Sequence, residues 1–180
     1  IAQRFSTFYK EKNMKLRYND YRLPSESEPQ QALMLTWPHQ NTDWKDYLDE
    51  ITMVYIAMAD SITKHENLWI VTPQKQVVSL LLTQHLTAEQ CLRVRYFEIE
   101  TNDTWTRDHA ALTLKCGKEF KYLDFKFNGW GEKFAWQKDN AITKKMAEQQ
   151  AFSGVVEYHN DFVLEGGSIE SDGEGTILTT

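Results

Sequence analysis

The sequence predicts a mixed α/β fold, and three local patterns support this prediction. Short apolar runs at residues 32–37 and 68–72 are each closed by a proline, which is typical of buried strands. Between them, apolar side chains recur every three or four residues from position 44 to position 62, as on one face of a helix. Across residues 108–158, the predicted order is strand, strand, helix, strand. At 180 residues the chain can bury one substantial core, so we expect one domain.

The first half of the chain is predicted to alternate strands and helices. In chain order these elements are a strand, a long helix, a strand, a helix and a strand, over residues 32–37, 42–62, 68–72, 76–85 and 94–99. Asn41 or Thr42 can cap the long helix, because a short polar side chain accepts a hydrogen bond from a free N–H of the first turn. Polar residues 102–108 are then expected to form a loop.

The second half is predicted to hold two strands, a helix, a strand and a hairpin. The strands and the helix cover residues 110–115, 120–127, 139–149 and 155–158. The final stretch, residues 162–180, contains Gly166-Gly167 and then a hairpin turn at Asp172-Gly173. Its last strand, residues 176–180, needs a neighbour for its backbone hydrogen bonds, so we expect that the chain is cut within a longer fold. Residues 1–13 are polar and aperiodic, and we interpret them as an upstream extension or an expression remnant before a domain at 14–180.

Composition narrows the classes of function. The net charge of −6 argues against nucleic acid as a partner, because phosphate binding needs clustered Lys and Arg. The only cysteines, Cys91 and Cys116, lack metal-ligand spacing and predict no disulfide framework. No apolar run approaches the ~18 residues that span a bilayer, and no signal-peptide core is visible. We therefore expect a cytoplasmic protein without membrane contact, metal or cofactor.

Residues 102–108 (NDTWTRD) concentrate charged and aromatic groups. A bound guanidinium keeps its charge, so a site must meet its planar N–H groups with carboxylates, and an aromatic ring can cover its face. The alternative is a surface loop in which Arg107 pairs locally with Asp103 or Asp108. The sequence by itself leaves both interpretations open.

Three further positions have two interpretations each. Glu165 ends an apolar strand and precedes Gly166-Gly167, so its carboxylate lies either where a backbone or a ligand comes very close or on a solvated bulge between strands. Trp130, between two glycines, either holds its ring over a pocket or fills the core at a tight turn. His109 is expected to have a local structural role. Neither cysteine is a convincing nucleophile, because no His lies nearby in the sequence.

Five blocks, taken in this order, resemble the family of agmatine deiminases and bacterial peptidylarginine deiminases. The blocks lie at residues 22–30, 35–44, 102–108, 123–131 and 164–175. The resemblance spans about residues 15–180. It implies the pentein fold (an α/β propeller), a ring of five ββαβ-type units, of which this chain would form the N-terminal part, roughly half of the ring.

The resemblance also implies a site and a reaction. Asp108 would hold the substrate guanidinium, Trp105 would shape the pocket, Glu165 would be a second acid, and Arg107 would brace the loop. The family hydrolyses agmatine to N-carbamoylputrescine and ammonia, or acts on peptidyl-arginine. Its general base His and nucleophilic Cys are expected further along a longer chain, so this chain alone is expected to be inactive. The alternative is a non-catalytic half-pentein that associates with itself or with a partner chain.

Overall fold

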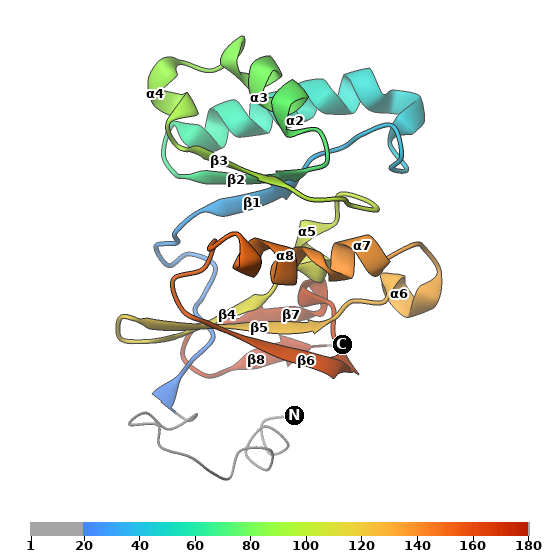
Figure 1. Cartoon of the computed structure of the whole chain (residues 1–180). Coiled ribbons are helices and arrows are strands. Elements are labelled where there is room, and N and C mark those ends of the chain that lie inside the picture. Colours follow the sequence, from blue (N-terminus) through green and yellow to red (C-terminus); the bar gives the residue numbers. More distant parts are fainter. Residues whose placement is uncertain (1–19, 180) are drawn as a thin grey trace.

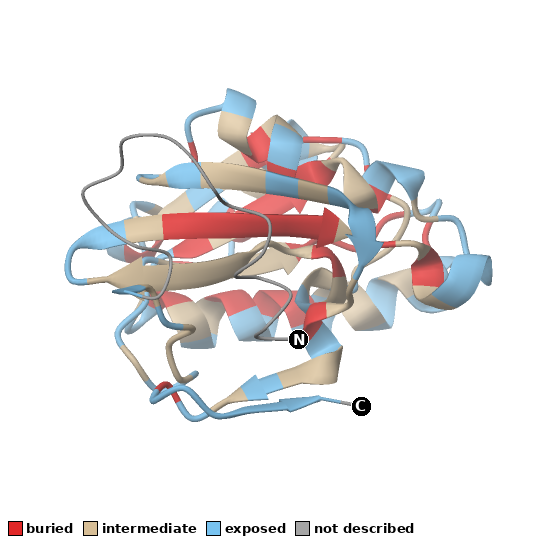
Figure 2. Ribbon diagram, turned by 90° about the horizontal axis from the view of Figure 1, so that it is seen from below, coloured by how far each residue is buried: buried red, intermediate tan, exposed pale blue. Residues whose placement is uncertain are grey.

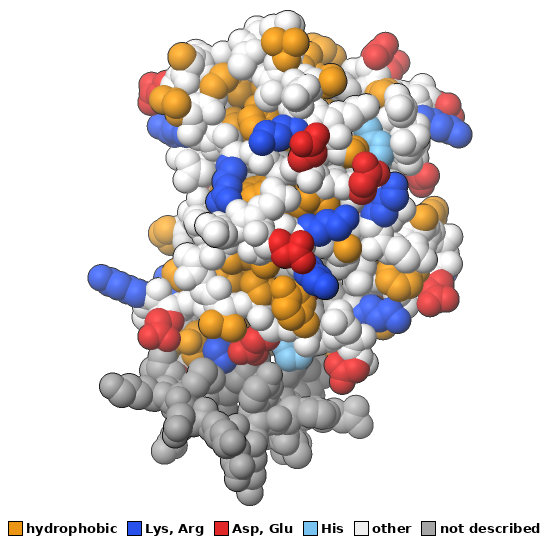
Figure 3. All heavy atoms as spheres, viewed as in Figure 1, with side chains coloured by type: hydrophobic (Ala, Val, Ile, Leu, Met, Phe, Trp, Pro, Cys, Tyr) orange, Lys and Arg blue, Asp and Glu red, His pale blue; other side chains and the backbone are white. Residues whose placement is uncertain are grey.

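The computed structural model describes residues 20–179 as two three-stranded sheets and a two-stranded hairpin, with helices packed on the sheets (Figure 1). The predicted extension at residues 1–13 lies outside the described residues. Within residues 20–179, no helix has the length and apolar character needed to cross a bilayer. On the face seen in Figure 3, acidic and basic side chains are interspersed.

The first sheet is parallel throughout and belongs to a strand-helix-strand-helix-strand unit. Its strands lie in the order β1-β2-β3, with the bounds β1 (Leu33–Thr36), β2 (Leu68–Thr72) and β3 (Val94–Glu98). Its outer face is covered by α2 (Leu48–Thr63), α3 (Lys75–Thr83) and α4 (Ala88–Cys91) (Figure 1). Successive side chains of β2 enter two different cores. Leu68 and Ile70 pack with residues of α2 and α3, whereas Trp69 and Val71 pack with Ile142. Both faces of β2 are therefore buried, which explains its continuous apolar run.

The long helix begins later than the sequence predicts. Thr42 does not cap it, because its hydroxyl donates to the carbonyl of His39 at 2.7 Å and closes a turn. The His39 ring in turn lies 2.9 Å from the Thr101 hydroxyl, which ties this turn to the chain after β3. A short 3₁₀ turn, η2 (Lys45–Tyr47), follows, and α2 begins only at Leu48. The hydroxyl that the local pattern assigned to the helix is thus used in a turn, and a tertiary contact between His39 and Thr101 holds that turn in place.

The second sheet has the predicted strand-strand-helix-strand order. β4 and β5 are antiparallel, β5 and β6 are parallel, and the bounds are β4 (Leu112–Cys116), β5 (Glu119–Lys126) and β6 (Val155–Val163). The connection from β5 to β6 contains α6 (Gly129–Glu132), α7 (Gln137–Asn140) and α8 (Ile142–Glu148). The single helix predicted at 139–149 is therefore two, separated at Ala141. α8 lies between the two sheets and places Ile142 and Met146 in the second core (Figure 1). Buried residues concentrate along β5, whereas β6 is largely exposed (Figure 2).

The predicted hairpin is present and is held to the second sheet by the N-terminal segment, which is the described chain before β1 (residues 20–32). It consists of β7 (Ile169–Ser171) and β8 (Ile177–Thr179), and Asp172 accepts N–H groups of Glu174 and Thr176 in the turn. The backbone of Arg22 pairs with Lys115 of β4, and its guanidinium donates to the Gly173 carbonyl at 2.9 Å. The same guanidinium binds Glu28 and lowers the pKa of that carboxyl to about 2.

Candidate functional site

The loop after β3 is anchored by a buried carboxylate. Asp139 of α7 accepts the backbone N–H of Asn102 at 2.6 Å and that of Asp103 at 3.1 Å. Burial raises the pKa of Asp139 to about 6, although the two N–H donors favour the ionised form. This pair of hydrogen bonds holds the start of the loop against the β5–β6 connection.

Asp103 orients the tryptophan of this loop. Its carboxylate accepts the backbone N–H of Thr104 at 2.8 Å and the indole N–H of Trp105 at 3.2 Å, and burial raises its pKa. The indole N–H of Trp44 donates to the Thr104 hydroxyl at 2.9 Å, which adds a second support. Asp103 therefore positions Trp105 and has a structural role.

The end of the predicted loop is a short helix, α5 (Thr106–His109), which packs against the end of β1. The Thr106 hydroxyl accepts the backbone N–H of Thr36 at 3.0 Å, and the His109 ring lies 3.3 Å from the Thr36 hydroxyl. Burial lowers the pKa of His109 to about 4, so its ring is neutral at neutral pH. These contacts are the structural role expected for His109.

Arg107 does not pair with either neighbouring aspartate, so the alternative of a locally paired surface loop is wrong. Its guanidinium forms ion pairs with Glu26 at 2.5 Å and Glu170 at 3.6 Å, and donates to the Ile169 carbonyl at 3.2 Å. Arg107 thereby connects α5 to the N-terminal segment and to β7. This is the bracing role that the resemblance implies.

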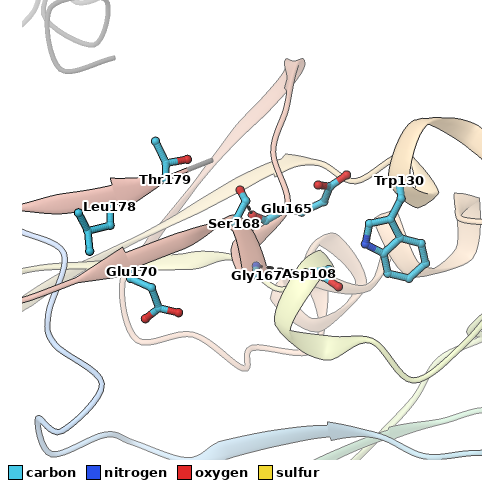
Figure 4. A pocket seen from close by; sticks show the side chains of 8 residues that line it. All are labelled: Asp108, Trp130, Glu165, Gly167, Ser168, Glu170, Leu178 and Thr179. Carbon is cyan, nitrogen blue, oxygen red and sulfur yellow. Dashed lines mark hydrogen bonds between the residues drawn. The ribbon is translucent and has the colours of Figure 1, made fainter.

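Asp108 and Glu165 line the same cavity, which has a volume of about 440 Å³. In Figure 4 the side chains of Asp108 and Glu165 both lie on the side of the cavity where Trp130 lies. The cavity wall is formed by Asp108, Trp130, Glu165, Gly167, Ser168, Glu170, Leu178 and Thr179. The Asp108 carboxylate accepts the backbone N–H of Gly167 at 3.1 Å, so it is fixed in position without a charged partner from its own loop.

The glycine pair makes this meeting possible. A Cβ at Gly166 would overlap the carbonyl oxygen of Arg107, and a Cβ at Gly167 would overlap the Asp108 carboxylate. A residue without a side chain at Gly166 lets the 3₁₀ turn η3 (Gly166–Ser168) lie this close to α5, and one at Gly167 leaves room for the Asp108 carboxylate. Of the two interpretations of Glu165, the one with a close backbone approach holds.

Trp105 lines a second, neighbouring cavity of about 350 Å³ rather than the first. Its wall is formed by Asp43, Trp105, Asp108, Trp130 and Phe134, and we call it the aromatic slot. Asp108 and Trp130 belong to both cavities. The three predicted site residues therefore lie around two adjoining cavities that share Asp108.

Sequence reasoning missed Asp43, Phe134 and Glu170 as lining residues, because none lies near the predicted loop in the chain. Trp130 was left with two interpretations, and the pocket interpretation holds. The two glycines that flank Trp130 were the signal available in the sequence. In the structure Gly129 and Gly131 both have positive φ, as does Trp130 itself at 57°. Cys91 and Cys116 are free, and neither lines either of the two cavities.

Comparison with known proteins identifies the family. Residues 22–180 match the family model of Porphyromonas-type peptidyl-arginine deiminases. An agmatine deiminase of Stutzerimonas stutzeri is 29% identical over 178 residues, covering 91% of this chain and 44% of the relative. A solved agmatine deiminase of C. jejuni with substrate bound is 33% identical, with a TM-score of 0.78 over 88% of this chain and 45% of that chain.

A further solved relative, named a putative arginine deiminase from Porphyromonas gingivalis, is 41% identical, with a TM-score of 0.78 over 89% of this chain and 47% of that chain. The chain thus spans less than half the length of the relatives it matches. These matches confirm the predicted α/β, partial-pentein fold. Because the family model matches residues 22–180, the chain belongs to the family of Porphyromonas-type peptidyl-arginine deiminases.

Proposed function

We propose that this chain carries the guanidinium-binding part of a deiminase site that acts on agmatine. Asp108 and Glu165 would bind the guanidinium, and Trp105 would form a wall beside it. The observation that carries the proposal is the meeting of the two carboxylates in one cavity, with Asp108 held by the Gly167 N–H. The names of several relatives, which are agmatine deiminases, support the choice of substrate.

The chemistry of a guanidinium suits this pair of acids. Its N–H groups point outward in one plane and carry a delocalised positive charge, which two carboxylates can accept from different sides. Because hydrogen bonds and packing already fix Asp108, little reorganisation is needed when the ligand binds. Carboxylates in this position keep the guanidinium protonated, and its carbon therefore remains electrophilic.

In the proposed reaction, a cysteine thiolate attacks the guanidinium carbon and ammonia leaves after taking a proton from a histidine. Water then hydrolyses the thiouronium intermediate, releasing the ureido product and regenerating the thiol. These two groups would come from a part of the protein beyond this chain. The preference for agmatine over peptidyl-arginine and a cytoplasmic location belong to the same proposal.

The 180-residue chain should therefore bind agmatine without hydrolysing it. We expect no ureido product in a citrulline-type colorimetric assay, and a measurable affinity in isothermal titration calorimetry. Asp108→Asn should weaken binding at least about tenfold, because a charged hydrogen bond contributes roughly 1.5–3 kcal/mol. Asp46→Asn, on the exposed turn η2, is the matched control and should bind as the parent chain does. Substantial turnover, or an unchanged affinity in Asp108→Asn, would contradict the proposal.

A second candidate is a non-catalytic half-pentein that pairs with itself or with a partner chain. β6 is at the end of its sheet, and several large apolar side chains on β6 and β8 are exposed, namely Val155, Tyr158, Phe162, Val163, Ile177 and Leu178. Edge strands with exposed apolar groups favour association. Light scattering at increasing protein concentration tests this candidate, and a strict monomer that binds no hydrophobic dye would argue against self-pairing.

A further inference from the structure

The aromatic slot is lined by both aromatic rings and carboxylates. Trp105, Trp130 and Phe134 supply three aromatic rings, and Asp43 and Asp108 supply two carboxylates. The ring centroids of Trp105 and Trp130 are 5.8 Å apart, and those of Trp130 and Phe134 are 5.6 Å apart, in edge-to-face pairs. An unbranched aliphatic chain suits such walls, and the faces of the rings also attract cations.

Two of these rings are more exposed than is usual for large aromatic side chains. Trp105 is 47% exposed and Phe134 is 53% exposed, although each contacts Trp130. Rings that stay in water around a concave site are typical of ligand-binding walls, because a bound ligand then removes apolar surface from water.

The backbone that carries Trp130 is strained, which is a second and independent sign of a functional wall. Trp130 and Glu132 both have positive φ, 57° and 65°, which non-glycine residues rarely adopt. The Asn128 side chain holds this turn by accepting the Gly131 N–H at 2.9 Å. Such conformations are energetically unfavourable and persist where the surrounding structure holds them, often at functional sites. Here the strain places one ring between the two cavities.

The charge of the slot is negative on more than one side. Asp43 lies close enough to Asp103 to contribute to the raised pKa of that carboxyl. Arg107 of α5, which is adjacent to Asp108 in the chain, forms its ion pairs with Glu26 and Glu170, and neither of these residues lines the slot. Among residues 20–179, the ion pairs found do not include Asp43. A ligand cation beside Asp43 would therefore be attracted without displacing a protein partner.

We propose that the aromatic slot is the subsite for the ligand's chain, and that Asp43 binds a terminal ammonium at its end. The ligand class is an unbranched guanidine with a second positive charge, with the guanidinium at Asp108 and the ammonium at Asp43. This inference rests on the proposed function, because Asp108 must first hold the guanidinium. It makes Asp43 a specificity residue that favours a free diamine-like ligand over an arginine within a peptide, which lacks the ammonium.

The test compares two ligands that differ only at the distal end. Agmatine carries the terminal ammonium, whereas 1-butylguanidine has the same guanidinium and chain length without it. Calorimetry and the indole N–H signals of Trp105 and Trp130 report binding to the intact chain. We expect agmatine to bind about threefold more tightly than butylguanidine, the effect of a solvent-exposed ion pair. Asp43→Asn should remove that difference by weakening agmatine alone, and added NaCl should reduce it in the parent chain.

The controls separate this inference from the proposed function. Asp46→Asn should leave both affinities unchanged, and Asp108→Asn should weaken both ligands. Equal affinities for the two ligands that Asp43→Asn does not alter would overturn the role of Asp43 while leaving guanidinium binding intact. An equal loss for both ligands in Asp43→Asn would also overturn it, because the residue would then act through the shape of the slot. If neither ligand binds the parent chain, the proposed function fails and this inference fails with it.

Discussion

Gly166→Ala should lower the free energy of unfolding by about 2 kcal/mol, because the new methyl group meets the backbone of α5. The atom in its way is the carbonyl oxygen of Arg107, which cannot move without shifting the helix. Gly166 is buried, so η3 must move away from α5 to relieve the overlap. For a chain of this size, the expected decrease in Tm is about 4–8 °C, measurable by circular dichroism. An unchanged Tm would mean that the two segments are not in contact.

Gly167→Ala is the matched comparison, because its methyl group would overlap a side chain rather than backbone. The obstructing atom is Oδ1 of Asp108, which can rotate away. We therefore expect a smaller loss of stability than in Gly166→Ala. Rotation of Asp108 would break its hydrogen bond with the Gly167 N–H, so agmatine affinity should fall while the chain stays folded. Retained affinity in a folded Gly167→Ala chain would contradict the assignment of Asp108.

Asp139→Asn should change how stability depends on pH. Burial raises the pKa of this carboxyl from 3.8 to about 6, so the folded protein holds the proton more tightly than the unfolded chain does. The stability contributed by the protonated group is complete below about pH 4 and is lost as the pH rises through about 6. The loss is about 3 kcal/mol, at about 1.4 kcal/mol for each pH unit. Because Asn does not titrate, the variant should gain about 2 kcal/mol of these relative to the parent chain between pH 4 and pH 6.

Urea unfolding of both proteins at pH 4, 5, 6 and 7 measures this difference. Comparing the variant with its parent is necessary because other buried groups titrate in the same range. Burial raises the pKa of Asp124 to about 6, whereas it lowers that of His109 to about 4, so His109 contributes stability that is lost as the pH falls. These contributions are common to both proteins and cancel in the difference. Asp46→Asn is the control, and a difference that stays constant over this range would contradict the prediction.

The sequence predicted elements whose cause lies within a few residues. The strand at 68–72 agrees with β2, because its apolar run and the following Pro73 define both ends locally. The Asp172-Gly173 turn agrees with the β7–β8 hairpin, because Asp172 binds N–H groups of its own turn. The start of α2 was predicted wrongly, since Thr42 binds the His39 carbonyl in a turn that Thr101 supports from elsewhere in the chain.

The candidate site shows the same difference between features set by neighbouring residues and features set by contacts between distant residues. The sequence by itself determined which residues are candidates for binding a guanidinium, because the carboxylates, rings and glycines of residues 102–108 and 164–167 are visible in the local sequence. Tertiary structure alone decided that Asp108 meets Glu165, that Arg107 binds Glu26 and Glu170, and that Asp43 shares a cavity with Trp105. The reason is that local patterns depend on the backbone geometry of neighbouring residues. Contacts between distant residues depend on how the sheets and α5 pack, and here two missing side chains at Gly166 and Gly167 allow that packing.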